Sequence, residues 1–441
     1  MAVALPFEGI PTVWRVLFVV AFVVIVVMLA WTILLFVKGG RAREHAPEAP
    51  PDGAAAFTWL FLVPALNEAV TIRDSVARLL AIPVERRHIV VIDDGSDDGT
   101  SDALADIDAP DLHVLRREPP EARQGKASAL NYAYRASADL LGEVDRAQVV
   151  VVVIDADGRL HPDAPRYVAP HFAEDERLGG VQTLVRIYNR HRLLTWLQDV
   201  EFSVYGFLYQ AGRTPWGTAG MGGNGQFNRL SALDAVVDHE GPWRDRLTED
   251  QDLGLRLLGA GWHGRQELRA AVDQQGLPGL RKLFRQRTRW SQGNLQAMGL
   301  MGVVWRARVP LIARLDLLSY LLMPLWQSIV GASLIVAIVL AILDVAPFWG
   351  DLVWWQLVFF YLLGFGGVLL GCIARGAGHG VRGLLLGLLI AQVYAFYTWL
   401  LWPVLVRATA RQLTDRRGWV KTEREQVKDA AARPRPPAAR A

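Results

Sequence analysis

The stretch VVVVVIDADG, residues Val149–Gly158, decides the fold. Five valines and an isoleucine form a continuous apolar run, which is typical of a strand buried on both faces of a parallel sheet. Ligands of such sheets bind at the carboxyl ends of the strands, and this end carries Asp155 and Asp157. Alternate residues of an extended segment point to the same side, so we predict that the two carboxylates share one space.

Two carboxylates at the end of a buried strand are unfavourable unless a cation joins them. Carboxylate oxygens are hard ligands that suit Mg²⁺ or Mn²⁺, and these ions usually also bind substrate phosphates. The letters DADG also fit the Asp-x-Asp-Gly motif of phosphatases of the haloacid dehalogenase type. In those phosphatases the motif belongs to the first strand, whereas here a nucleotide-binding-like half precedes it.

Three earlier apolar runs indicate further strands, and helical stretches separate them. The strands are expected at Phe57–Val63, His88–Asp93 and Leu112–Leu115, and the helices include Glu68–Leu80 and Lys126–Ala138. This alternation predicts an α/β fold with a mainly parallel sheet covered on both faces. No Gly-rich dinucleotide fingerprint follows the first strand, which argues against a dehydrogenase.

The chain is too long for one compact domain and too apolar for an ordinary soluble enzyme, with 441 residues, 52% of them hydrophobic, and a net charge of +3. Four apolar runs are each about long enough to cross a bilayer. They are Trp14–Val37, Leu315–Leu343, Leu352–Ile373 and Leu384–Val406. Buried core helices are the alternative, but such runs seldom exceed about 14 residues.

The distribution of basic residues predicts the orientation. Lys38, Arg41 and Arg43 follow the first apolar run, so the positive-inside rule places residue 38 onward in the cytosol. Four spans would return the C-terminus to the outside, yet residues 407–417 are strongly basic. Either the tail departs from the rule or one segment does not cross fully. We expect a transmembrane helix within 1–45, a linker at 46–56, a cytosolic domain at 57–301 ending in an interfacial helix at 279–302, three membrane segments within 311–406, and a basic, Pro-rich, disordered tail at 407–441.

Several motifs follow the predicted strands or begin helices. DDGS includes Asp94 at a strand end, where an ordinary acidic turn is the alternative interpretation. GKASALN places Lys126 at a helix start, a position that can hold an anion. TED carries Glu249 and Asp250, which either favour the helix dipole or supply a general base. Thr248 is the expected cap of that helix.

QRTRW, Gln286–Trp290, lies on a helical stretch shortly before the C-terminal apolar runs. Residues three and four apart share a face of a helix, so we expect Gln286, Arg289 and Trp290 to point the same way. An amide, a guanidinium and an indole thus converge on one ligand.

Taken in order, PALNE, DDGS, GKASALN, DAD, TED and QRTRW resemble family 2 glycosyltransferases, in particular the membrane-embedded processive synthases of cellulose, hyaluronan, chitin oligosaccharides and poly-N-acetylglucosamine. The resemblance covers residues 57–296 and the membrane layout. It implies a GT-A-like nucleotide-sugar-binding domain joined to transmembrane helices. It also implies a UDP-sugar donor, a glycan acceptor, a lipid bilayer and no nucleic acid as partners.

The resemblance further implies a role for each motif. The nucleotide-binding residues would be Ala65, Glu68, Asp94, Lys126 and Asp155. Mg²⁺ or Mn²⁺ would be held by Asp155 and Asp157. Catalysis would rest on Asp250 as the base, beside Glu249. The diphosphate would contact Arg289, and the acceptor sugar would stack on Trp290, with Gln286 in the same site.

One stretch departs from the family pattern. Relatives carry a short small-residue stretch at the acceptor site, and here it is GMGGNGQFNRLSAL, Gly220–Leu233. We expect Gly223 to belong to this acceptor loop, and Asn224 and Gln226 to touch the acceptor or donor sugar.

The sequence therefore predicts an inverting, UDP-sugar-dependent hexosyltransferase of the plasma membrane, with a cytosolic catalytic domain. It would extend and export a β-linked polysaccharide of hexose or N-acetylhexosamine. Two alternatives stay open: a transferase that adds one sugar to a lipid carrier, and a catalytically silent nucleotide-binding subunit. The sugar, the linkage and accessory export subunits cannot be read from the sequence.

Overall fold

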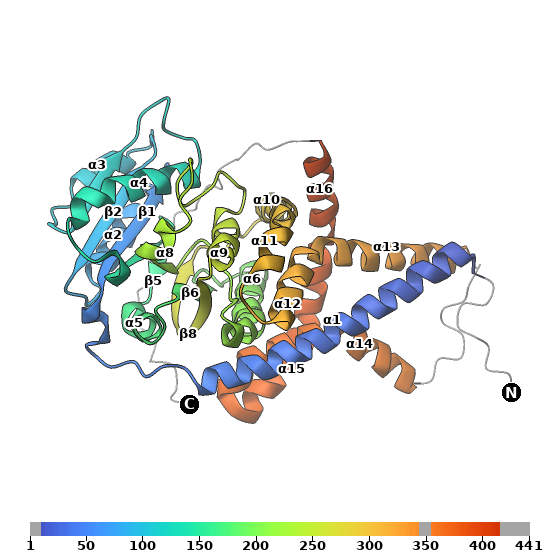
Figure 1. The fold of residues 1–441 in the computed structure, drawn as a ribbon. Coiled ribbons are helices and arrows are strands. Elements are labelled where there is room, and N and C mark those ends of the chain that lie inside the picture. The colour runs from blue at the N-terminus through green and yellow to red at the C-terminus, as the bar shows by residue number, and fades with distance from the viewer. Residues whose placement is uncertain (1–9, 344–353, 415–441) are drawn as a thin grey trace.

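The computed structural model describes residues 10–343 and 354–414. Its centre is an eight-stranded sheet in the order β3-β2-β1-β4-β7-β6-β8-β5, with helices on both faces (Figure 1). The strands are β1 Thr58–Ala65, β2 Arg87–Asp93, β3 Leu112–Arg116, β4 Val149–Val153, β5 Arg159–Leu160, β6 Leu178–Ile187, β7 Gln226–Arg229 and β8 His263–Gln274. Strands β3, β2, β1 and β4 pair in parallel, which confirms the predicted α/β class and the mainly parallel sheet.

The other half of the sheet is mixed, and the sequence did not reveal it. Strand β7 runs antiparallel to both neighbours, β4 and β6, and β5 pairs antiparallel with β8 at the far edge. Strands β6 and β8 are parallel. Strand β7 has polar residues at fully buried positions, including Gln226 and Asn228, so no apolar run marks it.

The helices of this domain fall between and after the strands. They are α2 Ile72–Leu80, α3 Thr100–Ala105, α4 Lys126–Leu141, α5 Ala164–Glu174, α6 Leu193–Val204, α7 Ala211–Arg213, α8 Leu230–Asp234, α9 Glu249–Gly259, α10 Leu280–Ala297 and α11 Met301–Arg306. A π-helical segment, η3 Tyr205–Gln210, joins α6 to α7.

Strand β1 shows why the predicted strands are continuously apolar. Trp59, Phe61 and Val63 point to one face and pack in a cluster with residues of α2 and α5. Leu60 and Leu62 point to the other face and pack in a second cluster with α4, α8 and α9. Because both faces are covered, every position of the strand except Pro64 is buried.

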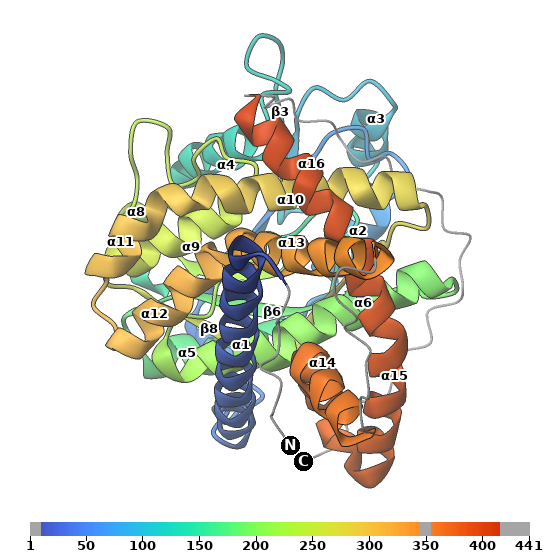
Figure 2. The same cartoon turned by 90° about the vertical axis from the view of Figure 1, so that its right-hand side faces the viewer.

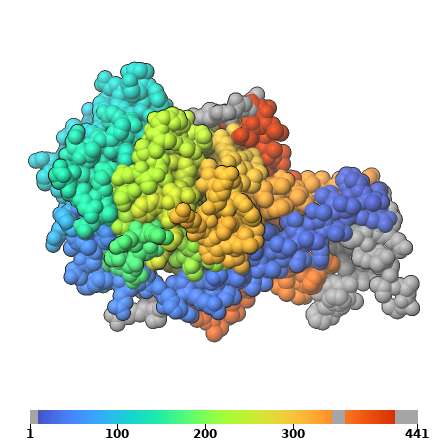
Figure 3. Space-filling model, viewed as in Figure 1, coloured from blue at the N-terminus to red at the C-terminus, as the bar shows by residue number. Residues whose placement is uncertain are grey.

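The chain reaches this domain from helix α1, Thr12–Glu44, which extends far beyond the domain (Figure 3). The predicted linker at 46–56 is fixed to the domain surface. Arg269 donates a hydrogen bond to the Pro47 carbonyl at 2.7 Å, and Arg166 donates one to the Ala49 carbonyl at 2.9 Å. A 3₁₀ turn, η1 Gly53–Ala56, then leads into β1.

The run predicted as one span at Leu315–Leu343 is two helices. Helix α12, Leu311–Leu321, ends before α13, Met323–Ile342, whose first turn contains Pro324. Proline is favourable at a helix start because its missing N–H would have no partner there. Helix α12 packs on the domain, where its Leu317 joins the apolar cluster of Leu258 from α9.

A buried ion pair fixes α12 to the domain. Asp316 accepts hydrogen bonds from Arg213 of α7 and from the Trp31 indole of α1, each at 2.6 Å. A buried carboxylate needs such partners. Helix α12 therefore belongs to the domain, and the long apolar helix begins at Met323.

The run predicted as a span at Leu384–Val406 is also interrupted. Helix α14, Trp354–Gly376, and α15, Gly380–Leu400, form an antiparallel hairpin, and α16, Trp402–Leu413, turns away from it (Figure 2). The segment 407–413, expected to be disordered, is helical and lies over α10. The rest of the tail, 415–441, lies outside the described residues.

Contacts with the domain explain this arrangement. Arg375 at the hairpin turn lies 3.3 Å from Asp199 of α6, and the Tyr397 hydroxyl of α15 donates to Glu201 of α6 at 2.8 Å. Arg411 of α16 donates to Gln292 of α10 at 3.2 Å. Three described stretches are long and apolar enough to cross a membrane, namely Thr12–Glu44, Met323–Ile342 and the interrupted stretch Val358–Leu413.

Candidate functional site

The carboxyl ends of β1 and β2 form one side of the site. Ala65 ends β1, and its carbonyl accepts a hydrogen bond from the Asp94 N–H at 2.8 Å. Glu68 lies in the following loop, where its N–H donates to Thr100 at 2.8 Å. The structure thus brings Ala65, Glu68 and Asp94 together. The Asp94 side chain is buried and pairs with Arg117 at 2.5 Å; burial nevertheless raises the pKa of Asp94.

The DADG stretch forms a tight turn, and this corrects the geometric argument from the sequence. Strand β4 ends at Val153, and the Gly158 N–H donates to the Asp155 carbonyl at 2.7 Å. Asp155 and Asp157 therefore lie in a turn and not in an extended strand, so the alternation of side chains along a strand does not determine where their carboxylates point. Asp157 is buried and accepts from the Gln275 N–H at 3.0 Å, whereas Asp155 is partly exposed.

Lys126 at the start of α4 binds Asp155. Its Nζ lies 2.6 Å from Asp155 Oδ1, 3.7 Å from Glu249 Oε1 and 3.4 Å from the Gly223 carbonyl. Burial lowers the pKa of Lys126, but the carboxylates of Asp155 and Glu249 outweigh it and raise the pKa overall. Within the chain this lysine is paired with a carboxylate; that it also holds an anionic ligand stays a prediction.

Asp250 stands in the first turn of α9 beside this cluster. Burial, then the negative charge of Glu249, raise the pKa of Asp250 to about 7. A carboxyl group with such a pKa can both accept and hold a proton near neutral pH. Thr248 occupies the N-cap position, but its side chain caps no backbone N–H. The prediction that the Thr248 side chain caps this helix is therefore wrong.

The glycine-rich loop approaches Asp250 closely. Gly223 has a φ of 77°, and a Cβ at this position would lie 2.9 Å from Asp250 Oδ2. Glycine fits this backbone conformation and this proximity, which other residues would strain. The close approach of this loop to Asp250 therefore has a physical reason; that Gly223 belongs to the acceptor loop stays a prediction.

Asn224 and Gln226 have a different role from the expected one. Both side chains are buried. Asn224 accepts from the Asp155 N–H and donates to Gln274, each at 3.1 Å, while Gln226 lies within β7. The prediction that these two side chains touch a sugar is therefore replaced by a structural role: Asn224 holds the DADG turn through the Asp155 N–H.

The three residues predicted on α10 are Gln286, Arg289 and Trp290. Each of their side chains is partly buried. Gln286 accepts a hydrogen bond from Arg287 at 3.2 Å. Arg289 makes no hydrogen bond or ion pair with any other described residue, so its guanidinium is available to a ligand. Trp290 contacts Phe202 of α6 edge-on, with ring centroids 6.0 Å apart.

Arg287 is a residue of this site that the sequence reasoning missed. Its guanidinium lies 4.1 Å from the centre of the Trp290 ring and forms a 2.5 Å ion pair with Glu201. The cation covers one face of the indole and fixes its orientation. The i, i+3 spacing of Arg287 and Trp290 was the available signal.

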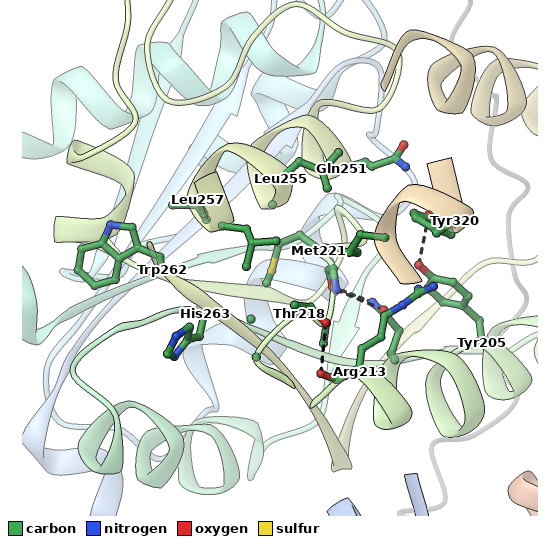
Figure 4. Close-up of a pocket in the computed structure, with 18 residues that line it drawn as sticks. Tyr205, Arg213, Thr218, Met221, Gln251, Leu255, Leu257, Trp262, His263 and Tyr320 are labelled. Atoms are coloured by element: carbon green, nitrogen blue, oxygen red, sulfur yellow. Dashed lines mark hydrogen bonds between the residues drawn. The ribbon is translucent and has the colours of Figure 1, made fainter. Parts of the chain in front are cut away.

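A small cavity of about 40 Å³ lies between η3, α9 and α12 (Figure 4). Its wall includes Gln251, the residue after Asp250, and Tyr205 of η3, whose hydroxyl lies 3.4 Å from that of Tyr320. Neither Asp250 nor Trp290 lines this cavity. Amides, hydroxyls and an indole line it together with apolar groups. The lining residues include Gln210, Arg213, Met221, Gln251, Trp262 and Tyr320.

Comparison with known proteins matches this architecture. Residues 58–293 fit the family model described as glycosyltransferase like family 2. The chain is a family 2 glycosyltransferase. Among its relatives, a probable glycosyltransferase, YdaM, of Bacillus subtilis (strain 168) is 30% identical over 259 residues, which are 57% of either chain. The poly-beta-1,6-N-acetyl-D-glucosamine synthase of Staphylococcus aureus (strain COL) is 30% identical over 54% of this chain and 55% of that one.

The glycosyltransferase therefore spans less than two thirds of either relative's length. A solved structure with a similar fold is the mannosyltransferase PcManGT from Pyrobaculum calidifontis in complex with GDP-Man and Mn²⁺. It has a TM-score of 0.60 and 18% identity, and the match covers 91% of this chain and 99% of that one. The chain therefore has a GT-A fold, and the match reaches beyond the sheet domain into the long apolar helices.

The effect of the Glu249 charge on the pKa of Asp250 can be tested by mutation. A base must be deprotonated, so kcat/KM should rise as the pH rises through the pKa of Asp250, about 7. Glu249→Gln removes the charge that helps to raise this pKa and should move the acid limb to lower pH. The measurement is kcat/KM for nucleoside diphosphate release from about pH 5 to about pH 8. Asp245→Asn, at an exposed position nearby, should leave the limb in place; an unmoved limb in Glu249→Gln would contradict the electrostatic account.

Proposed function

We propose that the chain is an inverting, UDP-sugar-dependent transferase that extends a β-linked polysaccharide of hexose or N-acetylhexosamine. One observation carries the proposal: a carboxyl group with a pKa of about 7 stands next to a lysine–aspartate pair at the strand ends. A base lies on one side and a cationic group on the other, as sugar transfer from a nucleotide requires. The relative from Staphylococcus aureus, a poly-beta-1,6-N-acetyl-D-glucosamine synthase by name, supports a polymer as the product.

The donor would lie across the carboxyl ends of β1, β2 and β4. Ala65, Glu68 and Asp94 surround the place proposed for uridine. Lys126, which stays protonated because its pKa is raised, would pair with the diphosphate. Arg289 supplies a second cation that no described residue neutralises, and a guanidinium suits a diphosphate because it can donate two parallel hydrogen bonds.

The residues present fit a divalent metal ion. The Asp155 carboxylate already binds a cation, the Lys126 ammonium, at 2.6 Å. Among the described residues, no group of three or more His, Cys, Asp or Glu side chains is arranged for a metal, and Mg²⁺ commonly uses only one or two carboxylates together with substrate phosphates and water. Asp155 and Asp157 would hold Mg²⁺ or Mn²⁺, which when bound supplies positive charge to the leaving diphosphate.

The proposed reaction is a single displacement. Asp250 accepts the proton of an acceptor hydroxyl, the hydroxyl oxygen bonds to the anomeric carbon, and the bond from that carbon to the diphosphate breaks. UDP leaves with its charge balanced by Lys126 and Arg289. One displacement inverts the anomeric centre, so an α-linked donor gives a β-linkage.

The acceptor would lie with its reacting hydroxyl towards Asp250. The free face of Trp290 would stack on its sugar ring, while Arg287 holds the opposite face. For the membrane, we propose that α1, α13 and α14 cross it and that α15 lies in the inner leaflet against α14, where the Tyr397 hydroxyl reaches Glu201. Helix α16 would stay on the cytosolic side, where Arg411 donates to Gln292. This arrangement would place the basic tail in the cytosol and satisfy the positive-inside rule.

Replacing the proposed base tests the chemistry. Asp250→Asn keeps the shape of the side chain and removes the proton acceptor. Transfer should fall about a hundredfold or more, while UDP binding, measured by calorimetry on the detergent-solubilised protein, should not weaken. If UDP affinity falls in parallel with the rate, Asp250 binds the donor and is not the base.

Replacing the proposed sugar platform tests polymerisation. Stacking of this kind contributes about 1–3 kcal/mol, by analogy with bases on aromatic side chains, so Trp290→Ala should lower polymer synthesis roughly tenfold to hundredfold. UDP binding should stay unchanged. Trp305→Ala removes an exposed indole of α11 and serves as the matched control.

Product length from a radiolabelled UDP-sugar distinguishes the alternatives. A polymer from the wild type that shortens in Trp290→Ala supports the proposal. A folded Trp290→Ala protein that polymerises at the wild-type rate contradicts the stacking role. A wild-type product of one added sugar would instead identify a transferase that modifies a lipid carrier.

A further inference from the structure

A second, open basin lies away from the site, where the domain meets the ends of the membrane helices. It is bounded by the C-terminal end of α1, the ends of β6 and β8, and the turn between α14 and α15. None of Asp94, Lys126, Asp155, Asp250 and Trp290 lines it. The proposed transfer reaction therefore leaves this basin unexplained.

The basin is strongly basic. Ten arginines and six acidic residues line it. Some of these arginines are neutralised within the chain; Arg190 and Arg375, for example, both pair with Asp199. Arg41 at the end of α1 and Arg382 at the start of α15 are exposed, and their guanidinium groups form no hydrogen bond or ion pair with other described residues. The excess positive charge thus lies at the ends of two membrane-facing helices.

One wall of the same basin is apolar. Leu386 and Ile390 of α15 line it below Arg382, and Phe207 and Ala211 line it from η3 and α7. Leu386 is 52% exposed, although leucine gains free energy when it leaves water. A ligand that pairs with the arginines and also covers the apolar wall must carry an anionic group and an apolar chain.

We propose that this basin binds an anionic phospholipid of the inner leaflet. Its phosphate would lie between Arg41 and Arg382, and its acyl chains would run along Leu386 and Ile390. Basic pockets between membrane helices on the cytosolic side are known to suit such headgroups. A free phosphate would satisfy only the arginines and leave the apolar wall in water. Bound lipid would join α1 to the α14–α15 hairpin, which Arg375 already ties to the domain at Asp199.

The test compares lipids and variants by thermal unfolding of the full chain in detergent. Phosphatidylglycerol should raise the apparent Tm of the wild type by about 3–5 °C, because a ligand that binds the folded state stabilises it. Phosphatidylcholine and inorganic phosphate should raise it by less than half as much. The double variant Arg41→Gln/Arg382→Gln should lose most of the gain.

A matched double variant, Arg73→Gln/Arg135→Gln, removes two exposed arginines of α2 and α4 and should keep the gain. UDP release should persist in all proteins, since no variant touches the transfer site, and it confirms folding. The proposal fails if phosphatidylcholine stabilises equally, if inorganic phosphate replaces the lipid, or if both double variants respond alike.

Discussion

The structure of the site depends on one interaction, the ion pair between the Lys126 ammonium and the Asp155 carboxylate. Three separate elements carry charges to this point: the turn after β4, the first residue of α4 and the first turn of α9. Their carboxylates would repel one another in a partly buried space, and the ammonium makes the arrangement stable. It also sets the protonation of Asp250, because burial and the charge of Glu249 raise its pKa to about 7 while Lys126 opposes them. Asp155 and Asp250 are thereby coupled through the charge of Lys126.

Close backbone approaches hold this cluster in place. A Cβ on Gly158 would lie 2.8 Å from the Asp155 carbonyl, so only glycine allows the turn that presents Asp155. Gly223 allows the neighbouring loop to reach Asp250, and Asn224 fastens that loop to the Asp155 N–H. The motifs are therefore parts of one packed unit. A change in either loop would move Asp250 and Asp155 together.

The sequence predicted the parallel half of the sheet because burial on both faces leaves a continuous apolar run, as in β1 and β4. It could not predict β7, whose buried Gln226 and Asn228 break that pattern. The breaks at Leu322 and Leu401 were missed for a similar reason, since apolar length alone does not reveal contacts such as Arg213 with Asp316. The motifs predicted which residues gather in the site. They did not predict that Asn224 would be buried or that Arg287 would cover Trp290, because both depend on contacts between distant elements.

The most direct measurement is a structure of the full chain determined with UDP and Mn²⁺. The account predicts that the metal binds the Asp155 carboxylate, that Lys126 Nζ moves from this carboxylate to the diphosphate, and that uracil lies beside Asp94. Metal and nucleotide bound elsewhere, or a Lys126–Asp155 pair that persists with UDP in the site, would contradict it.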